Sequence, residues 1–591
     1  MNKPLILLLL LLLLTPQPHS SSAQPSAVPA PPQPRSSSAQ PSAALISPQP
    51  SSGSAWPSAT PAAIAAPSAA PSAAPLAALI DKACYLTGER LHVSLSLDDT
   101  DPSRVVYIEV SDTQHLYAQV MAQLQAGRGW ADIALPQTMH SGNYTVTAYT
   151  RQMLTQRQQP HSQVISVVNV GHVTRADQIT FMQPDSTALP VPYRSYRPGE
   201  VIEAIPPVEA SDARMLTLTF SAYDLQTPDY SDVQPTFQLP DASLPLEYEG
   251  HVVTGRLVGN HDINQSFLSR VGKDALLFEG KPVGEGLFQF YTRGMNGRMA
   301  TALTAVNHDG NTIPMQFVSP YAKLLPSSLP ALQVYCTDQQ LRQRSLSAQR
   351  EELLSQQLAI PDTLPHSFQF MGDETHRLYD LDEWRRFSSV RQIIVEFLSA
   401  VHRRRENGTN FLHIFDPEIN KVSALPALVL LDGVPVYDLD RFLDYDARLL
   451  KYVQIYSKDY VFGSLVFHGA ILFISQRGLL TNYKLEAGTQ LVTYDFPQLR
   501  PAFQIIAPNT TGTLYWNPDV CPTAGPLHLT APGAYPTATV AIPPVSVPGG
   551  SAASASPSAV PPSPSLYQLL WQWLDADGHP HAQRGYIAVT Q

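Results

Sequence analysis

The residues best suited to chemistry lie near the end of the chain. Asp575 and Asp577 precede His579 and His581 in the segment DADGHPH, and carboxylate and imidazole groups are common metal ligands. Two histidines on one strand face could hold a metal ion, but a third ligand is missing from this pattern. A calcium-binding loop would need a bidentate glutamate where Tyr586 stands. We therefore interpret the segment as a hairpin turn and predict neither a metal site nor a bound cofactor.

Motifs typical of catalysis do not occur in the sequence. It contains neither the GxSxG nucleophile motif nor the HExxH zinc motif. Trp571 and Trp573 would share one strand face and could bind sugar, although a pair that faces the core is the simpler interpretation. We predict that the protein is not an enzyme. A hydrolase that acts on peptides or glycans through an unrecognised site is the alternative.

Composition and charge exclude further classes of function. The net charge of −11 argues against a basic surface large enough for nucleic-acid binding. The three cysteines, Cys84, Cys336 and Cys521, are too few for a disulfide framework or a four-thiolate zinc site, and they allow at most one bridge. The 55 prolines, together with only 15% charged residues, indicate globular modules separated by proline-rich spacers.

The N-terminus reads as an export signal. Lys3 precedes an apolar run over residues 5–14, which is too short to cross a bilayer as a helix. Small residues at positions 21–23 predict signal-peptidase cleavage between Ala23 and Gln24. No later segment has the apolar length of a membrane span. We predict an exported protein, periplasmic or associated with the outer membrane, without a transmembrane span after residues 1–23 are removed.

Two segments have the composition of spacers. Residues 24–78 are almost entirely proline, alanine and serine, and residues 543–565 have the same composition without any charge. Such segments have too few large apolar side chains to offset the entropy cost of folding. We predict a disordered stalk at 24–78 and a loop insertion at 543–565.

Residues 79–170 show the period-2 alternation of half-buried strands in four short segments, 91–97, 105–110, 130–135 and 144–149. Four strands at close spacing predict an antiparallel β-sandwich.

The sequence motifs that flank these strands resemble those of a known domain. Residues 85–89 (YLTGE) and 141–144 (SGNY) are similar to the opening and the close of the second macroglobulin domain. Residues 149–153 resemble the YTxxM tail of Bacteroidota envelope proteins that carry this domain. The CGEQ thioester motif of α-macroglobulins does not occur in the chain, so the resemblance does not imply covalent trapping.

The middle of the chain changes from strand to helix patterns. Residues 175–330 alternate as strands and predict one or two immunoglobulin-like units. Residues 338–358 and 389–405 read as helices, the second amphipathic with a basic tail, His402 to Arg405. We interpret this tail as the solvated last turn of the helix rather than as a nucleic-acid site.

Residues 338–480 hold a helical connector and a second resemblance. A strand that ends in DGVP at residues 432–435, a short helical segment and two further strands resemble the plug domain of TonB-dependent receptors. The stretch that follows is too short for the strands of a transmembrane barrel, so we expect a plug-like domain without its barrel. Residues 504–591 contain the motif TLYWNP at residues 513–518. This motif resembles the segment that opens the terminal sandwich of the same envelope proteins.

Two three-residue motifs suggest a modification. Ser186 and Thr363 each follow an aspartate in words that resemble the acceptor of the Bacteroidota O-glycosylation system. We expect both in exposed, proline-flanked loops.

Together these patterns predict a multi-domain, mainly β protein, in which immunoglobulin- or macroglobulin-like sandwiches accompany one α+β plug-like domain. The predicted function is that of an exported envelope scaffold or binding module that engages another envelope protein and no nucleic acid. A passive structural stalk is a further alternative. Tyr460 and Phe462, at the turn of the plug-like domain, are the predicted contact residues. The competing interpretation is that the aromatic residues of this domain pack in its core.

Overall fold

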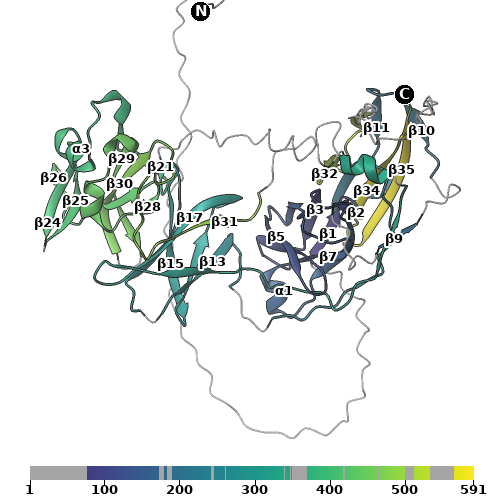
Figure 1. The fold of residues 1–591 in the computed structure, drawn as a ribbon, viewed down its shortest axis with the longest axis horizontal. Helices are drawn as coiled ribbons and strands as arrows, with labels where there is room; N and C mark the ends of the chain where they lie inside the picture. The colour runs from purple at the N-terminus through teal and green to yellow at the C-terminus, as the bar shows by residue number, and fades with distance from the viewer. Residues whose placement is uncertain are drawn as a thin grey trace, which may run out of the picture. The chain divides into compact units, whose positions relative to one another are not determined.

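The computed structural model describes most of the chain after residue 75. The described residues are 76–171, 179–182, 190–240, 245–259, 261–337, 340–346, 348, 369–406, 408–416, 420–462, 465–499, 512–532 and 565–590. They are mainly β and form several sheets, which confirms the predicted fold class (Figure 1). In this part of the chain, no helix has the length and apolarity needed to span a membrane.

The first region is a two-sheet sandwich built from consecutive strands. One sheet has the order β1-β3-β6 and the other the order β2-β8-β7-β4-β5. Apolar side chains from both sheets share one core. The strands are β1 (Leu76–Ile80), β2 (Cys84–Leu86), β3 (Arg90–Leu97), β4 (Val105–Ser111), β5 (Leu116–Gln123), β6 (Arg128–Ala134), β7 (Gly142–Tyr149) and β8 (His161–Val168).

Strand β3 is more buried than its alternating pattern predicts. Its apolar face lies in the sandwich core, but His92, Ser94 and Ser96 on the opposite face are also buried. The reason is a distant segment of the chain that covers this face. The His92 ring stacks on Trp516 with ring centroids 4.9 Å apart, and the Ser94 hydroxyl donates to the carbonyl of Pro518.

A second sheet occupies the middle of the chain and is completed by a strand from much later. Its order is β18-β17-β14-β15-β16-β13-β19, and β31 pairs antiparallel with β17. The strands are β13 (His251–Leu257), β14 (Gln265–Arg270), β15 (Leu276–Gly284), β16 (Leu287–Thr292), β17 (Arg298–Val306), β18 (Thr312–Ile313), β19 (Met315–Val318) and β31 (Gln490–Asp495).

The region predicted to resemble a receptor plug lies between β19 and β31 in sequence; it is called the plug-like region here after that prediction, which stays a prediction. Its main sheet has the order β23-β29-β30-β27-β28, with β27 parallel to β30, and a smaller sheet has the order β24-β25-β26. The main elements are β23 (Arg377–Asp380), α3 (Val390–Glu396), β24 (Val401–Glu406), β25 (Thr409–Asp416), β26 (Lys421–Val422), β27 (Leu428–Leu431), β28 (Val434–Pro435), α4 (Leu439–Leu443), β29 (Leu450–Phe462) and β30 (Leu465–Ser475).

The predicted helix over 389–405 is shorter than expected. Ser389 caps α3 by accepting a hydrogen bond from the Gln392 amide, but the helix ends at Glu396. The basic tail, His402 to Arg405, therefore lies in β24 rather than in a last helical turn. Tertiary pairing explains the difference, because β24 pairs residue by residue with β25, and such a ladder outweighs local helix propensity.

The last sheet joins two parts of the chain that are far apart in sequence. Its order is β10-β35-β34-β12-β32, and β11 pairs with β33 in a two-stranded sheet. Residues 190–222, which the sequence assigns to an immunoglobulin-like region, thus share sheets with the C-terminal residues. The strands are β10 (Arg194–Tyr196), β11 (Val201–Ala204), β12 (Met215–Ala222), β32 (Thr513–Asn517), β33 (Leu527–Thr530), β34 (Ser565–Leu574) and β35 (Pro580–Val589).

Candidate functional site

Tyr460 and Phe462, the predicted contact residues, are buried. Only 6% and 5% of their surfaces are exposed. Phe462 meets Phe267 of β14 edge to face, with ring centroids 5.4 Å apart, and Tyr460 meets Phe370 at 5.2 Å. Contact residues for a partner would have to be exposed, but both are buried, because Phe462 packs against a strand of the middle sheet and Tyr460 packs on Phe370. A contact with a partner protein stays a prediction; in the structure Phe462 joins its own region to the middle sheet, whereas Tyr460 contacts Phe370 of its own region.

Six further aromatic residues between positions 437 and 467 are buried or half-buried as well, as the competing interpretation expected. They belong to two apolar clusters. These residues are Tyr437, Phe442, Tyr445, Tyr452, Tyr456 and Phe467.

The DGVP segment, residues 432–435, forms a second contact between the plug-like region and the middle sheet, and this contact is called the joint below. The buried Asp432 carboxylate accepts hydrogen bonds from the Ser475 amide (2.7 Å), the Ser475 hydroxyl (2.6 Å) and the Leu480 amide (2.7 Å). Burial raises the pKa of Asp432, although these hydrogen bonds oppose the shift. Next to it, Gly433 has a φ of 84°, and a Cβ there would lie 2.4 Å from the carbonyl oxygen of Arg270. Only glycine fits this turn against β14.

Glu109 of the first sandwich binds a loop more than two hundred residues away. Its carboxylate accepts hydrogen bonds from the amides of Lys323 (3.0 Å) and Leu324 (2.7 Å). Gln119 and Tyr149 of the same sandwich donate to the same carboxylate. Since the side chain of Glu109 is fully buried, it acts as an anchor for the loop after β19.

A buried network around Glu247 has the acid–histidine–hydroxyl order of a catalytic triad, but with a tyrosine where a triad has serine. The Nδ1 atom of His251 lies 2.8 Å from Glu247, and its Nε2 atom lies 2.8 Å from the hydroxyl of Tyr494. Arg151 lies 3.1 Å from the same carboxylate, and Tyr107 donates to it. Burial opposes ionisation of Glu247, but Arg151 and His251 outweigh it and lower its pKa.

The position of this network argues for a structural role. The side chains of Glu247 and His251 are 1% and 0% exposed, so substrate cannot reach them in this conformation. Burial also lowers the pKa of His251. The network joins three segments: the first sandwich through Tyr107 and Arg151, the start of β13 through His251, and β31 through Tyr494.

Arg344 forms a third buried polar contact between distant segments, after those of Glu109 and Glu247, and this contact is called the tie below. It lies in the helical segment 340–346 and contacts Glu89 through two nitrogens, at 2.5 and 2.9 Å. It also donates to Asp224 at 2.9 Å, while Lys82 binds Glu89 at 2.9 Å. Burial would raise the pKa of Glu89, but Arg344 and Lys82 outweigh burial and lower it to about 2. The tie connects the first sandwich to the segments that follow β12 and β20 (Leu332–Tyr335).

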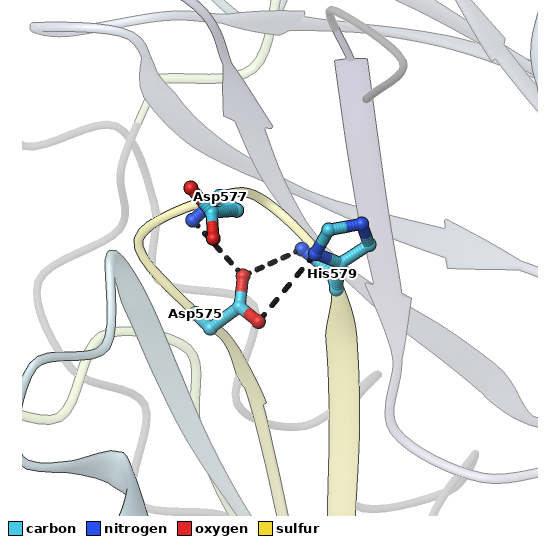
Figure 2. Close-up of side chains that lie close together, drawn as sticks. All are labelled: Asp575, Asp577 and His579. Carbon is cyan, nitrogen blue, oxygen red and sulfur yellow. Dashed lines mark hydrogen bonds and ion pairs between the residues drawn. The ribbon is translucent and has the colours of Figure 1, made fainter. Parts of the chain in front are cut away.

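Asp575 organises the turn between β34 and β35, as the hairpin interpretation expected. Figure 2 shows its carboxylate facing the backbone of the turn, where Oδ1 accepts from the amides of Asp577 (3.0 Å) and His579 (2.8 Å). Its Oδ2 lies 2.9 Å from Nε2 of His581 and 3.6 Å from Nδ1 of His579. A hydrogen bond from His581, together with the His579 amide, lowers the pKa of Asp575 to about 2.

Metal binding at this turn would compete with those hydrogen bonds. Asp575, Asp577 and His579 each offer one ligand atom, and these atoms lie within 4.8 Å of one another. Such a group could hold a divalent ion, but both oxygens of Asp575 already have partners in the turn. The neighbouring Trp571 and Trp573 are buried in an apolar cluster, which confirms that the pair faces the core.

Four predicted positions lie outside the described residues. They are the cleavage positions Ala23 and Gln24 and the acceptor positions Ser186 and Thr363. The functions assigned to them stay predictions.

The basic strand β24 is the charged surface that the sequence patterns placed incorrectly. Its residues after Val401 are all exposed, and β24 is the end strand in the order β24-β25-β26. His402, Arg403, Arg404 and Arg405 therefore stand together on an open sheet edge. The sequence patterns missed this surface because they assign these residues to a helix rather than to a strand.

Comparisons with known proteins give only weak likenesses. Neither a family model nor a curated protein sequence matches the chain. A tetra-tandem repeat from the extending region of a large adhesion protein shares 8% identity, covers 87% of this chain and 74% of its own, and gives a TM-score of 0.12. A putative membrane-anchored protein from Corynebacterium diphtheriae shares 11% identity, covers 44% and 60%, and gives 0.13.

Macroglobulins are also among the similar structures. Elastase-activated α-2-macroglobulin from Escherichia coli shares 9% identity and gives a TM-score of 0.19. The match covers 87% of this chain but only 43% of that protein. At such TM-scores no function follows from these likenesses.

Proposed function

We propose that the protein is an exported, non-enzymatic scaffold of the cell envelope that binds another envelope protein. What chiefly supports a scaffold is the use of the buried ionisable groups. Glu89, Glu109, Glu247 and Asp432 each join segments that are distant in sequence. Charged groups in these positions hold sheets together, since a buried carboxylate is stable only when it is paired or hydrogen-bonded.

The plug-like region supports the binding part of the proposal. Its elements follow the order that the resemblance to TonB-receptor plugs implies: strand β27, the DGVP turn, helix α4, and strands β29 and β30. In those receptors the plug sits inside a barrel; here exposed residues among those described, such as Val395 of α3 and Arg403 of β24, offer surface to a partner. Its identification as a plug relative rests on the sequence words and this order of elements.

Crosslinking in living cells tests the proposal. A photo-crosslinker placed on the exposed surface of the plug-like region, for example at Val395, should give a discrete adduct with one envelope protein, identified by mass spectrometry. Val395 is 71% exposed. The same crosslinker at Val208, which is 85% exposed in another sheet region, serves as the control. A passive stalk would give no discrete adduct from either position, and recovery of the protein mainly in the cytoplasm would rule out the envelope location.

A further inference from the structure

Strand β24 is an open sheet edge that carries consecutive basic residues. It pairs with β25 on one side, and the described strands place no neighbour on its other side. In Figure 1 it lies at the left of the green segment with β25 and β26. From His402 to Glu406 every side chain is exposed. In a chain with a net charge of −11, this concentration of positive charge is a local exception.

The register of the β24–β25 ladder shows which backbone groups point outward. The Phe415 amide donates to the Ala400 carbonyl at 2.8 Å, immediately before the paired residues Val401 and Ile414. Hydrogen-bonded pairs alternate with non-bonded pairs along an antiparallel ladder. Arg403 and Arg405 therefore direct their amide and carbonyl groups away from β25, toward the open edge.

The opposite strand agrees with this register. Leu412 and Ile414 of β25 use their backbone groups on the far side, where the Leu412 carbonyl accepts from the Ala427 amide and the Ile414 carbonyl accepts from the Ser423 amide. The open edge of β24 thus offers two residues with the backbone geometry that an added strand requires.

Positive charge projects from both faces of the strand. Side chains alternate along a strand, so Arg403 and Arg405 lie on one face and His402 and Arg404 on the other. A flat anionic surface, such as a lipid headgroup layer, would meet only one of these faces. A strand that runs alongside the edge would place side chains beside both.

The charge also decides which kind of strand can pair here. Like charges directly opposite each other destabilise a strand pair, whereas opposite charges stabilise it. A second copy of β24 would place arginine beside arginine. An acidic strand would place carboxylates beside the guanidinium groups of Arg403, Arg404 and Arg405.

We propose that β24 is the docking edge for an extended acidic segment of a partner protein, which binds as an added strand. This inference rests on the proposed binding function and specifies the partner's chemistry. The simpler alternative is that the arginines only prevent edge-to-edge aggregation, as charges on edge strands commonly do. The two interpretations differ in whether the edge binds an acidic strand.

Fluorescence anisotropy with the purified mature chain tests this proposal. The probe is a fluorescein-labelled synthetic peptide in which two successive glutamates are followed by one threonine or valine, so that carboxylates lie on both faces of the added strand. We expect saturable binding that weakens as salt is raised. A matching peptide with glutamine in place of glutamate tests the charge. A peptide with the same side chains and N-methylated alternate amides tests the backbone pairing, and we expect neither control peptide to bind.

A pair of variants places the binding on β24. The double change Arg403→Gln and Arg405→Gln should weaken binding of the acidic peptide roughly three- to tenfold, since cross-strand charge pairs contribute modest energies. The matched control is Arg256→Gln with Arg298→Gln, two exposed arginines of the middle sheet. It should leave binding unchanged, and thermal unfolding checks that both variants fold.

Several results would overturn the proposal: no binding of the acidic peptide, equal binding of the N-methylated peptide, or equal affinity in the β24 variant. Binding to phosphatidylglycerol vesicles without binding to the peptide would show that the edge recognises a membrane surface instead. If the crosslinked adduct at Val395 persists in the β24 double variant although the peptide does not bind to the wild-type chain, the scaffold function stands and only the docking edge is wrong.

Discussion

The first sandwich and the C-terminal sheet have similar strands but are completed in different ways. All strands of the first sandwich come from residues 76–168, one after another. In the C-terminal sheet, β12 lies between β34 and β32, and Leu218 pairs with Trp571 on one side and with Asn517 on the other. The strands that complete this sheet are therefore separated in sequence by the whole middle of the chain.

The comparison shows where a chain of this type needs polar anchors. In sequence, the strands of the middle sheet lie between β12 and β32 of the C-terminal sheet. The plug-like region in turn lies in sequence between β19 and β31 of the middle sheet. The networks of Glu89, Glu109 and Glu247 all run between the first sandwich and segments that follow β12. Buried hydrogen-bonded charges are specific in geometry, so they define how distant segments meet.

The largest expected effect is a difference in independent folding. We expect a fragment of residues 76–171 to fold, because it contains both sheets of its sandwich. A fragment of residues 512–590 should not fold, because Trp571 and Trp573 lose the apolar side chains of β12 that share their cluster. Dispersion in amide NMR spectra and cooperative thermal unfolding measure both outcomes.

Adding the missing strand provides the control for this prediction. A peptide of residues 190–223 supplied in trans should restore folding of the C-terminal fragment, since it contains β10, β11 and β12. A C-terminal fragment that folds alone would show that its strands β34 and β35 suffice and would remove the contrast between the two regions.

The next largest effect concerns Arg344, which connects the first sandwich to the segments that follow β12 and β20. Arg344→Ala should lower the free energy of unfolding by about 3–5 kcal/mol, because Glu89 and Asp224 lose the partner of a buried ion pair. Urea unfolding measures the change. Arg342→Ala, an exposed position in the same helical segment, is the control and should change little. Equal stability of the two variants would mean that the tie does not couple the regions.

Local sequence patterns predicted the elements of the fold better than its connections. The alternation in residues 91–97 and 144–149 is visible in any short window, and both segments are strands, β3 and β7. The pairing of Met215 with Leu574 joins residues 359 positions apart, and alternation contains no information about such partners. Helix propensity likewise misassigned His402 to Arg405, because pairing with β25 is a tertiary effect.

The candidate sites show the same limit. Local turn chemistry correctly predicted the Asp575 hairpin, and the alternation of side chains along a strand correctly predicted the core-facing pair of Trp571 and Trp573. The burial of Phe462 depends on Phe267 in another sheet, which no local pattern encodes. Glu247 has no sequence signature, since its partners Arg151 and Tyr494 lie far from it on both sides.

The pH dependence of stability should reveal the tie at Glu89. Its pKa in the folded protein, about 2, lies below its ordinary value of 4.5. A lowered pKa stabilises the folded state above pH 4.5, and this contribution is lost as the pH falls toward 2. The contribution is on the order of 3 kcal/mol.

Comparing variants isolates this contribution from those of other carboxylates. The difference in unfolding free energy between the wild type and Glu89→Gln should shrink as the pH falls from about 5 to about 2. Glu203→Gln, at an exposed position of β11, should show no such trend. A constant difference for Glu89→Gln would contradict the assigned role of Arg344 and Lys82.

A smaller effect is expected at the joint between the middle sheet and the plug-like region. Gly433→Ala should destabilise the protein by roughly 2 kcal/mol, since the new Cβ meets the Arg270 carbonyl and φ is positive. Gly310→Ala has a similar φ of 82° but open space around it, so it should cost only about 1 kcal/mol. Chemical unfolding of both variants separates the close contact from the backbone strain, and equal losses would mean that the joint can yield.

The smallest effect is expected at an ion pair with the same chemistry as Arg344 but full access to water. Arg293 lies 2.6 Å from Glu249, and their side chains are 73% and 69% exposed. Water already solvates both charges, so Arg293→Gln should change the free energy of unfolding by less than about 1 kcal/mol. Salt should reduce even that small difference, whereas it should affect the buried tie of Arg344 much less. Urea unfolding at low and high salt provides the measurement. A loss at Arg293 as large as that at Arg344 would mean that burial is not what makes the buried ties strong.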